Sequence, residues 1–355
     1  MLPQLLRAGE WFVRSGIQFS NGGVARYYRA DLERNAPVST EITGYAASTL
    51  VYLHSLTGDQ QYLDAAQAAA SFLTRTAWDA AAGVMPFEID PVRYTYFFDC
   101  GIIVRGLLSV WRATGDEEYL GVAAALGRRM AVDFASTESD IHPILLLPGR
   151  EPAQRDAASW SRSSGCYQLK AALAWWNLFE ATGERAFVAP YERALEFSLK
   201  HWGDFLPGHS ERFRVMDRLH AFLYFLEGLM PRACDPRAAG AIAAGIRKVE
   251  GYIREIGPEF IRSDVYAQLL RIRLYDDWAG VFPLDRQAAC READALAQFQ
   301  AASSDPRIDG GFYFGRKGED WSPYINPVST AFAIQALALW GCHPSGVQPH
   351  PHLLI

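Results

Sequence analysis

The sequence has few cysteines, and the five that it has are far apart: Cys100, Cys166, Cys234, Cys290 and Cys342. They form no Cys-x-x-Cys pair and no Cys/His cluster, so their spacing argues against a zinc ribbon and against a thioredoxin-type redox motif. An odd number of widely spaced cysteines is typical of reduced thiols, and we expect most of them to be buried. The sequence therefore predicts no metal ligands and no cofactor.

Long apolar runs and concentrated positive charge are also missing. No stretch approaches the ~18 uninterrupted apolar residues of a membrane span. The first residues lack the apolar region and the small-residue cleavage site of a signal peptide. The net charge is −6 and no stripe of Lys and Arg occurs, which argues against a nucleic-acid partner. We therefore expect a soluble, cytoplasmic protein with no nucleic-acid partner and no membrane span, and its oligomeric state stays open.

What the sequence does contain is a repeated helical unit. One copy runs from Gly44 to Thr57-Gly58-Asp59, and a second runs from Gly101 to Thr114-Gly115-Asp116. The spacing from glycine to threonine is 13 residues in both copies (57 − 44 and 114 − 101). Such agreement predicts two equivalent helices, each followed by the same turn.

A third copy runs from Gly165 to Thr182-Gly183-Glu184, with a spacing of 17 residues (182 − 165). The extra four residues are about one helical turn, so they predict a first helix that is one turn longer here. In every copy the glycine after threonine suits the left-handed end of a helix, and the acidic residue suits the start of the next one. The unit is therefore a helical hairpin with a nearly all-apolar first helix and an amphipathic second helix. The second helices are predicted at Leu63 to Leu73, Leu120 to Met130 and Tyr191 to Trp202.

The hairpin pattern continues after residue 203 without the Thr-Gly signature. Predicted pairs are Asp217 to Met230 with Ala238 to Ile256, and Asp264 to Leu274 with Leu284 to Gln300, and Val328 to Trp340 is the first helix of a sixth pair. Its partner is missing at the C-terminal end, and the spare helix Leu2 to Ser15 is predicted to replace it. The sequence thus predicts an all-α fold, an (α/α)6 toroid of about six hairpins in which the N-terminal helix closes the ring. HEAT-type solenoids are the competing layout, but their shorter repeats need no long segment ahead of each first helix.

We assign residues 1–342 to a single toroid domain and residues 343–355 to a tail rich in Pro and His. The tail histidines His343, His350 and His352 are expected to have no structural role.

The polar and aromatic residues collect in long segments, without predicted secondary structure, that precede the first helices. Long irregular segments in a compact domain are usually functional, and in a toroid these would open onto one face of the central cavity. Aromatic rings beside carboxylates and arginines suit a carbohydrate, because rings stack on sugar faces and a carboxylate pair moves protons. Arginines would add recognition of an acidic sugar. The predicted substrate-binding residues are Tyr94, Trp160, Arg162, Arg214, Asp217, Arg262, Asp264, Arg316, Tyr324 and Asn326.

Glu41, Asp99 and His220 are the predicted catalytic residues. Glu41 and Asp99 lie two or three residues before a repeat glycine, at the start of a first helix, where acidic residues also serve as caps or dipole partners. His220 is three residues from Asp217 on one helix face, which fits a base with its orienting group and equally a structural pair. Asn326 with the proline after it is a standard helix start, so any ligand contact by Asn326 would be additional.

Ser39 to Tyr45, together with Thr57 to Leu63, resembles (α/α)6 toroid proteins of polysaccharide metabolism. These include the C-terminal region of D-glucuronyl C5-epimerases and, more distantly, N-acylglucosamine 2-epimerases and unsaturated glucuronyl hydrolases. The pattern is also similar to terpenoid-cyclase-like or prenyltransferase-like toroids of unknown function. As architecture the resemblance covers roughly residues 20 to 340. The acid motif and Gln/Trp repeats of squalene-type cyclases are absent, as is the zinc set of protein prenyltransferases, so the resemblance implies a fold and carries over no catalytic residue.

Three functions follow as hypotheses. The first is a carbohydrate-active enzyme (an epimerase, lyase or hydrolase) acting on an acidic sugar or oligosaccharide. The second is a non-catalytic glycan-binding or scaffold toroid, which predicts carboxylates tied up by neighbouring arginines. The third, an isoprenoid-processing toroid, predicts a cavity with few charges, and the polar segments count against it.

Overall fold

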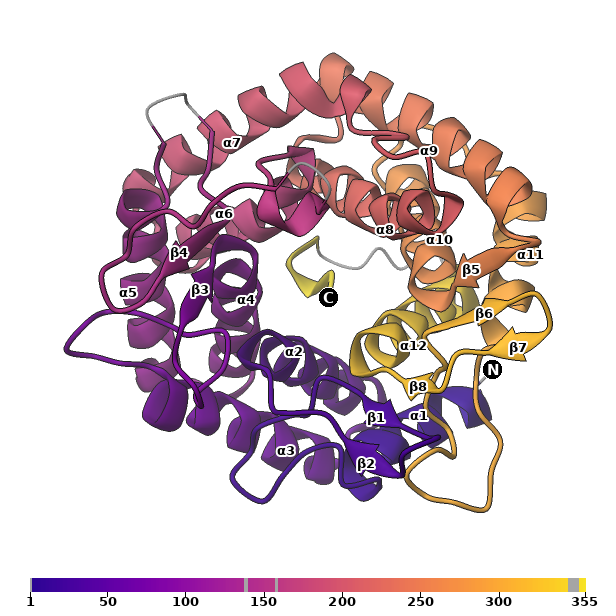
Figure 1. Cartoon of the computed structure of the whole chain (residues 1–355), viewed down its shortest axis with the longest axis horizontal. Helices are drawn as coiled ribbons and strands as arrows, with labels where there is room; N and C mark the ends of the chain where they lie inside the picture. The colour runs from indigo at the N-terminus through magenta and orange to yellow at the C-terminus, as the bar shows by residue number, and fades with distance from the viewer. Residues whose placement is uncertain (1, 137–139, 157–158, 344–350) are drawn as a thin grey trace. The chain divides into compact units, whose positions relative to one another are not determined.

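The computed structural model describes residues 2–136, 140–156, 159–343 and 351–355. The chain divides into two compact units. Unit 1 comprises Met1–Gln18, Ala25–Ala36 and Leu206–Ile355, and unit 2 comprises Phe19–Val24 and Pro37–Phe205. Helices make up nearly all of the regular structure in both (Figure 1).

Unit 2 consists of three consecutive helical hairpins. Their helices are α2 (Thr40–Thr57), α3 (Gln60–Phe72), α4 (Phe97–Thr114), α5 (Glu117–Asp133), α6 (Leu169–Thr182) and α7 (Val188–His201). The first helices α2, α4 and α6 pack side by side, while α3 contacts α2 and α4, and α5 contacts α4 and α6 (Figure 1). The second helices therefore form a separate layer that covers the first.

The turns of these hairpins confirm the reading of the Thr-Gly signature. Gly58, Gly115 and Gly183 have φ angles of 72°, 73° and 72°, in the left-handed region that glycine adopts without a steric penalty. Asp59 then caps α3 by accepting a hydrogen bond from the backbone N–H of Gln61 at 3.0 Å. Asp116 caps α5 in the same way. The hairpin is thus closed by local backbone chemistry.

In the first two copies the repeat glycine lies inside the first helix, one turn from its start. Both α2 and α4 begin four residues before their glycine, at Thr40 and Phe97. A Cβ on Gly101 would lie 2.4 Å from the carbonyl oxygen of Ala171 on α6, and one on Gly44 would lie 3.0 Å from the Cα of Ile103 on α4. These glycines therefore allow neighbouring helices to pack closely.

The first helix of the third hairpin, α6, is not longer than α2 and α4, contrary to the prediction. Gly165 is extended, with φ −170° and ψ 168°, and it precedes the short 3-10 helix Cys166–Gln168 and then α6. The wider spacing arises because this glycine stands in front of the helix, whereas its two counterparts lie within theirs.

Unit 1 contains the other three hairpins. Its helices are α8 (Arg212–Gly228), α9 (Pro236–Ile256), α10 (Ser263–Trp278), α11 (Arg286–Ala297), α12 (Pro327–Cys342) and α1 (Leu2–Arg14). The first helices α8, α10 and α12 pack in that order, and α1 packs on α12 as its second helix. The indole N–H of Trp11 on α1 donates to the backbone oxygen of Arg307 at 2.9 Å. The N-terminal helix therefore completes the sixth hairpin, as predicted.

Short antiparallel strands occupy the segments that precede the first helices, which were expected to be irregular. In unit 1, β1 (Tyr28–Arg29) pairs with β2 (Arg34–Asn35) and β8 (Tyr324–Ile325), and β6 (Gly315–Lys317) pairs with β5 (Phe260–Arg262) and β7 (Asp320–Trp321). In unit 2, β3 (Tyr94–Tyr96) pairs with β4 (Ile144–Leu146). Because β5 ends where α10 begins and β8 ends just before α12, these sheets fix how the chain enters its helices.

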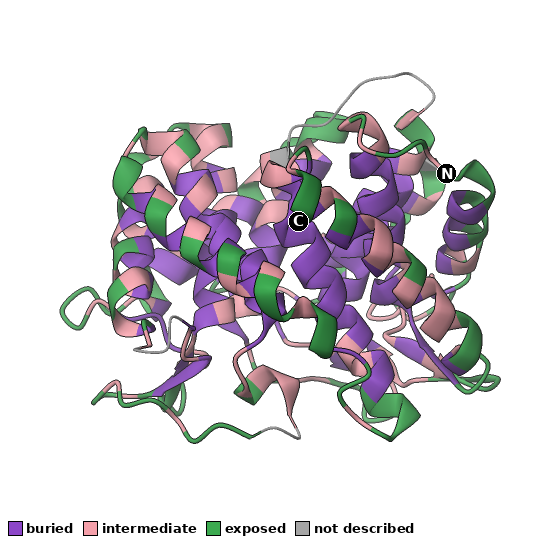
Figure 2. Cartoon of the chain, turned by 90° about the horizontal axis from the view of Figure 1, so that it is seen from above, coloured by how far each residue is buried: buried purple, intermediate pink, exposed green. Residues whose placement is uncertain are grey.

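Burial differs between the two kinds of helix. Every residue from Pro327 to Leu339 of α12 is buried, whereas α1, beside the N label of Figure 2, has a buried face and an exposed face. Among the described helices none combines the length and the apolar character needed to cross a membrane.

Two smaller expectations fail. Cys100 and Cys166 are buried, but three cysteines are exposed: Cys234 in the turn before α9, Cys290 on α11 and Cys342 at the end of α12. In the tail, His343 is hydrogen-bonded through Nε2 to the Oδ2 of Asp277 at 2.9 Å, so it does have a structural contact. Residues 344–350, with His350, lie outside the described part of the chain.

Candidate functional site

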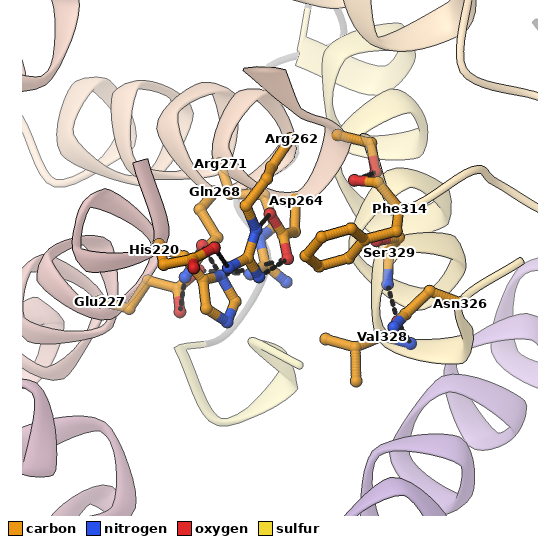
Figure 3. Close-up of polar contacts among 12 residues, drawn as sticks. His220, Glu227, Arg262, Asp264, Gln268, Arg271, Phe314, Asn326, Val328 and Ser329 are labelled. Carbon is orange, nitrogen blue, oxygen red and sulfur yellow. Dashed lines mark hydrogen bonds and ion pairs between the residues drawn. The ribbon is translucent and has the colours of Figure 1, made fainter. Parts of the chain in front are cut away.

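A buried polar network connects the first helices of unit 1. It begins at Arg262, the last residue of β5, and the pairing of Arg262 with Gly315 in β6 fixes its backbone. Phe314, the residue before β6, is held against the start of α10 by the backbone N–H of Ser263, which donates to its carbonyl at 3.1 Å. The Arg262 guanidinium lies 4.4 Å from the centre of the Phe314 ring (Figure 3). Strand pairing thus places one arginine over one aromatic ring.

Arg262 binds two carboxylates. Its Nε and Nη2 donate to the two oxygens of Asp264 at 3.0 and 2.5 Å, and its Nη1 donates to Asp217 at 2.9 Å. The side chains of Arg262 and Asp264 are 8% and 3% exposed, whereas that of Asp217 is 44% exposed. Burial acts to raise the pKa of Asp264, but the charge of Arg262 and its hydrogen bonds outweigh burial, so the pKa is lowered. Asp264 therefore stays ionised and does not serve as a proton donor.

His220 lies on α8 beside this ion pair. Its Nδ1 is 2.7 Å from the Oε1 of Gln268, an acceptor, and 3.4 Å from the Oδ2 of Asp264 (Figure 3). Gln268 turns its amide nitrogen toward Glu227 at 3.5 Å, which leaves Oε1 for the histidine. Nδ1 must therefore carry the hydrogen, and Nε2 has the lone pair. Among the described residues, Nε2 has no hydrogen-bond partner.

Burial determines the charge of His220, which is 6% exposed. Desolvation lowers its pKa from 6.5 to about 4. The charge of Arg262 also lowers the pKa, and the charge of Asp264 raises it by less than the other two effects lower it. The ring is therefore neutral at pH 7. A neutral imidazole with a fixed tautomer presents the lone pair of Nε2 as a proton acceptor.

The network continues deeper into unit 1 through residues that sequence reasoning missed. Glu227 on α8 forms a fully buried ion pair with Arg271 on α10. Arg271 also donates to Gln335 on α12 at 3.0 Å and lies 4.0 Å from the centre of the Phe332 ring. A signal was present, because Asp264, Gln268 and Arg271 recur at i, i+4 and i+7 on an otherwise buried helix.

The other predicted residues of unit 1 lie near the chain segments that enter the helices. Asn326 is the N-cap of α12 and accepts from the backbone N–H groups of Val328 and Ser329 at 2.9 and 3.1 Å, as predicted (Figure 3). Tyr324 has the guanidinium of Arg29 4.9 Å from its ring centre. The predicted pair of Asp217 and His220 does not form, because the carboxylate of Asp217 accepts a hydrogen bond from Arg262 instead.

Two predicted arginines of unit 1 lie at the surface or against a ring. Arg316 lies 5.7 Å from the centre of the Trp321 ring, and Arg214 is exposed in an ion pair with Glu211 at 3.2 Å. Arg214 is therefore a surface residue of the first turn of α8.

The remaining predicted residues belong to unit 2. Glu41 is half-buried in the first turn of α2, and Asp99 is 6% exposed in the first turn of α4. Tyr94 is exposed on β3, Trp160 packs edge-on against Tyr167 at 5.0 Å, and Arg162 is exposed. Their assigned roles in catalysis and binding stay predictions. No group of three or more His, Cys, Asp or Glu side chains in the described residues could hold a metal ion.

Comparison with known proteins identifies the fold. No family model matches the sequence, and no curated protein matches it. Solved structures do match over nearly their whole length. A sugar epimerase from a ruminal bacterium is 13% identical, with a TM-score of 0.69, and covers 94% of this chain and 95% of its own.

Two further solved structures are similar to this chain over nearly its whole length. Cellobiose 2-epimerase from Bacillus thermoamylovorans B4167 is 12% identical (TM-score 0.70, covering 92% of this chain and 95% of its own). A D-mannose isomerase is 7% identical (TM-score 0.71, covering 96% and 97%). Likeness at this identity shows a common fold. The predicted all-α (α/α)6 toroid of six hairpins is therefore confirmed, while the resemblance to D-glucuronyl C5-epimerases stays a prediction.

Proposed function

We propose that this protein is a carbohydrate-active enzyme that transfers a proton on a sugar, as an epimerase or an isomerase. The observation that carries the proposal is the state of His220: it is neutral, its Nδ1–H is held by Gln268, and its Nε2 is available. Its fold, which it has in common with two sugar epimerases and a D-mannose isomerase, is consistent with that chemistry.

The proposed reaction begins when Nε2 of His220 takes the proton from a sugar carbon next to the carbonyl. The electron pair of the broken C–H bond moves to the carbonyl oxygen and leaves an enediolate. Asp264, 3.4 Å from Nδ1, stabilises the imidazolium that forms. The proton of the C2 hydroxyl then passes to the former carbonyl oxygen, C2 becomes the carbonyl carbon, and return of the abstracted proton to C1 completes an aldose–ketose isomerisation, for which one base at carbon suffices. A 2-epimerase needs a proton donor on the opposite face as well.

Glycoside hydrolysis is a poorer match for this network. It requires one carboxylic acid that gives up a proton and one carboxylate that is available. Asp264 and Asp217 are both bound to Arg262, and the lowered pKa of Asp264 keeps it ionised. Neither is therefore suited to protonate a leaving group.

The arginines also indicate the charge of the substrate. The sequence predicted an acidic sugar. Arg262 is neutralised by two aspartates, and Arg271 is neutralised by Glu227. A second negative charge brought to either arginine would gain little. We therefore favour a neutral sugar, with a uronate as the alternative.

A non-catalytic glycan-binding protein is the second candidate. It is favoured by one observation, the binding of the buried carboxylates by arginines, which this hypothesis predicts. The two candidates differ in whether bound sugar exchanges a proton with solvent.

The test is deuterium incorporation. The protein is incubated in D2O with D-mannose, D-glucose, cellobiose or D-glucuronate, and the C2 hydrogen and any product sugar are followed by NMR. We expect deuterium at C2 with at least one neutral sugar, and a loss of about 100-fold or more in His220→Asn, as for removal of a general base.

His201→Asn is the matched control, since His201 is an exposed histidine at the end of α7. Sugar that binds without exchange in the unaltered protein supports the glycan-binding alternative. Equal exchange in His220→Asn and His201→Asn refutes the role of His220. Exchange with D-glucuronate alone refutes the preference for a neutral sugar.

A further inference from the structure

The last described residues of the chain lie against the deep end of the polar network of unit 1. Leu354 and Ile355 are 3% and 2% exposed. They follow a short 3-10 helix, Pro351–Leu353, drawn in yellow beside the C label in Figure 1. Their neighbours include Arg271 of α10 and Gln335 of α12, both of which are fully buried.

Backbone groups of this segment make three hydrogen bonds to those two side chains. Arg271 Nη1 donates to the backbone oxygen of Ile355, the last residue of the given sequence, at 3.1 Å. The N–H of Ile355 donates to Gln335 Oε1 at 3.0 Å, and Gln335 Nε2 donates to the carbonyl of Leu353 at 2.6 Å. Gln335 therefore uses both its donor and its acceptor on residues 353–355.

The chemistry of this contact resembles that of a sugar. The carbonyl of Leu353 and the N–H of Ile355 present one acceptor and one donor to Gln335, which is what a pair of neighbouring hydroxyl groups presents. Buried polar groups need partners, so Arg271 and Gln335 must bind something if the segment leaves. Arg271 has a further buried donor, Nε, without a hydrogen-bond partner among the described residues.

The site is also matched in charge to hydroxyl groups. The positive charge of Arg271 is already compensated by Glu227. A hydroxyl oxygen can accept a hydrogen bond from the same Nη1 group without placing a further charge beside that ion pair.

We propose that Arg271 and Gln335 form a subsite for sugar hydroxyls, that residues 353–355 occupy it in the unliganded protein, and that saccharide binding displaces them. This proposal rests on the proposed function, because it takes the ligand of the His220 network to be a sugar. The two places are continuous, since Gln268 and Glu227 link His220 to Arg271. Residues 353–355 are thus an internal competitor, which lowers the apparent affinity by the fraction of molecules in which the subsite is filled.

The first test measures displacement in the unaltered chain. Hydrogen exchange of a peptide that contains residues 351–355 is followed with and without saturating cellobiose, and in parallel with D-mannose. The Ile355 amide is expected to be protected without sugar, because it donates to Gln335, and to lose that protection by tenfold or more with sugar. Protection that is unchanged while sugar binds overturns the proposal.

The second test removes the apolar contacts that keep residues 353–355 in place. Leu354→Glu/Ile355→Glu places two charges where buried aliphatic side chains lie, so the segment is expected to leave and the affinity for cellobiose or D-mannose to rise at least tenfold. Leu354→Met/Ile355→Val is the matched control and should bind like the unaltered chain. Unchanged affinity in a folded Glu/Glu variant overturns the proposal, and if that variant does not fold, the hydrogen-exchange test decides.

A third variant, Gln335→Met, removes both amide groups of the subsite. It should release the segment and also weaken sugar binding, whereas a purely structural role for Gln335 predicts unchanged sugar binding. Failures are distinguishable. Displacement without deuterium incorporation refutes the proposed proton transfer alone, and incorporation with the segment still protected refutes the subsite alone.

Discussion

The charge of His220 leads to a quantitative prediction about stability. Its pKa is about 4 in the folded protein and about 6.5 in an unfolded chain. Between these values the unfolded state binds the proton and the folded state does not, so the free energy of unfolding falls as the pH is lowered. The contribution of His220 is fully present above about pH 6.5, falls as the pH decreases, and stops changing below about pH 4. Between pH 7 and pH 5 the linkage relation gives a loss of about 2 kcal/mol.

Substitution of His220 isolates this effect. His220→Asn does not titrate, so its free energy of unfolding should fall by about 2 kcal/mol less than that of the unaltered protein between pH 7 and pH 5. Urea unfolding at both values measures the difference, and comparing each variant with itself cancels the packing cost of the substitution. The ring can also be followed directly in protein labelled with 13C-histidine, where the His220 signal is assigned by its absence in the variant. A titration midpoint near 6.5, or equal pH dependence in the two proteins, would refute the reasoning.

Three other substitutions test how the fold is held together. Gly101→Ala should destabilise by roughly 1–3 kcal/mol or more, since its Cβ would lie 2.4 Å from a backbone oxygen of α6, whereas Gly121→Ala, with open space around it, should be neutral or stabilising in thermal unfolding. Arg271→Met should cost about 3–5 kcal/mol in urea unfolding, because it strands the buried charge of Glu227. The double variant Glu227→Leu/Arg271→Met should recover most of that loss, and no recovery would contradict the assigned cause. Asn326→Ala should cost about 1 kcal/mol through loss of the α12 cap, and an unchanged midpoint would show that other contacts hold the helix start.

The fold could be predicted well because its signals are local. A glycine after threonine ends a helix for steric reasons that do not depend on the rest of the chain, and Gly58 and Gly115 adopt the expected conformation. Amphipathic and all-apolar patterns predicted the helices of unit 1 to within a few residues, even without the Thr-Gly signature. The wrong prediction of a longer first helix in the third hairpin arose because the conformation of Gly165 is not a local signal. Spacing counts residues and not conformations, so an extended Gly165 and a helical Gly101 looked equivalent.

The candidate site could be predicted only in part. Asp217, His220, Arg262 and Asp264 were identified as polar residues at helix starts, and they do meet. Glu227, Gln268, Arg271 and Gln335 were missed, because they lie deep in helices whose surroundings were expected to be apolar.

The hairpins follow from local signals in the sequence, since turn, cap and helix periodicity act within a few residues of one another. The pairing of the N-terminal helix with the first helix of the last hairpin follows as well, because a helix with one apolar face must bury it. The partners and the charge of His220, in contrast, depend on how the helices pack. The sequence placed it beside Asp217, but its hydrogen bond is to Gln268, 48 residues away along the chain. Desolvation and Coulombic interaction depend on distance in space, so a neutral imidazole with a fixed tautomer exists only once α8 and α10 have packed.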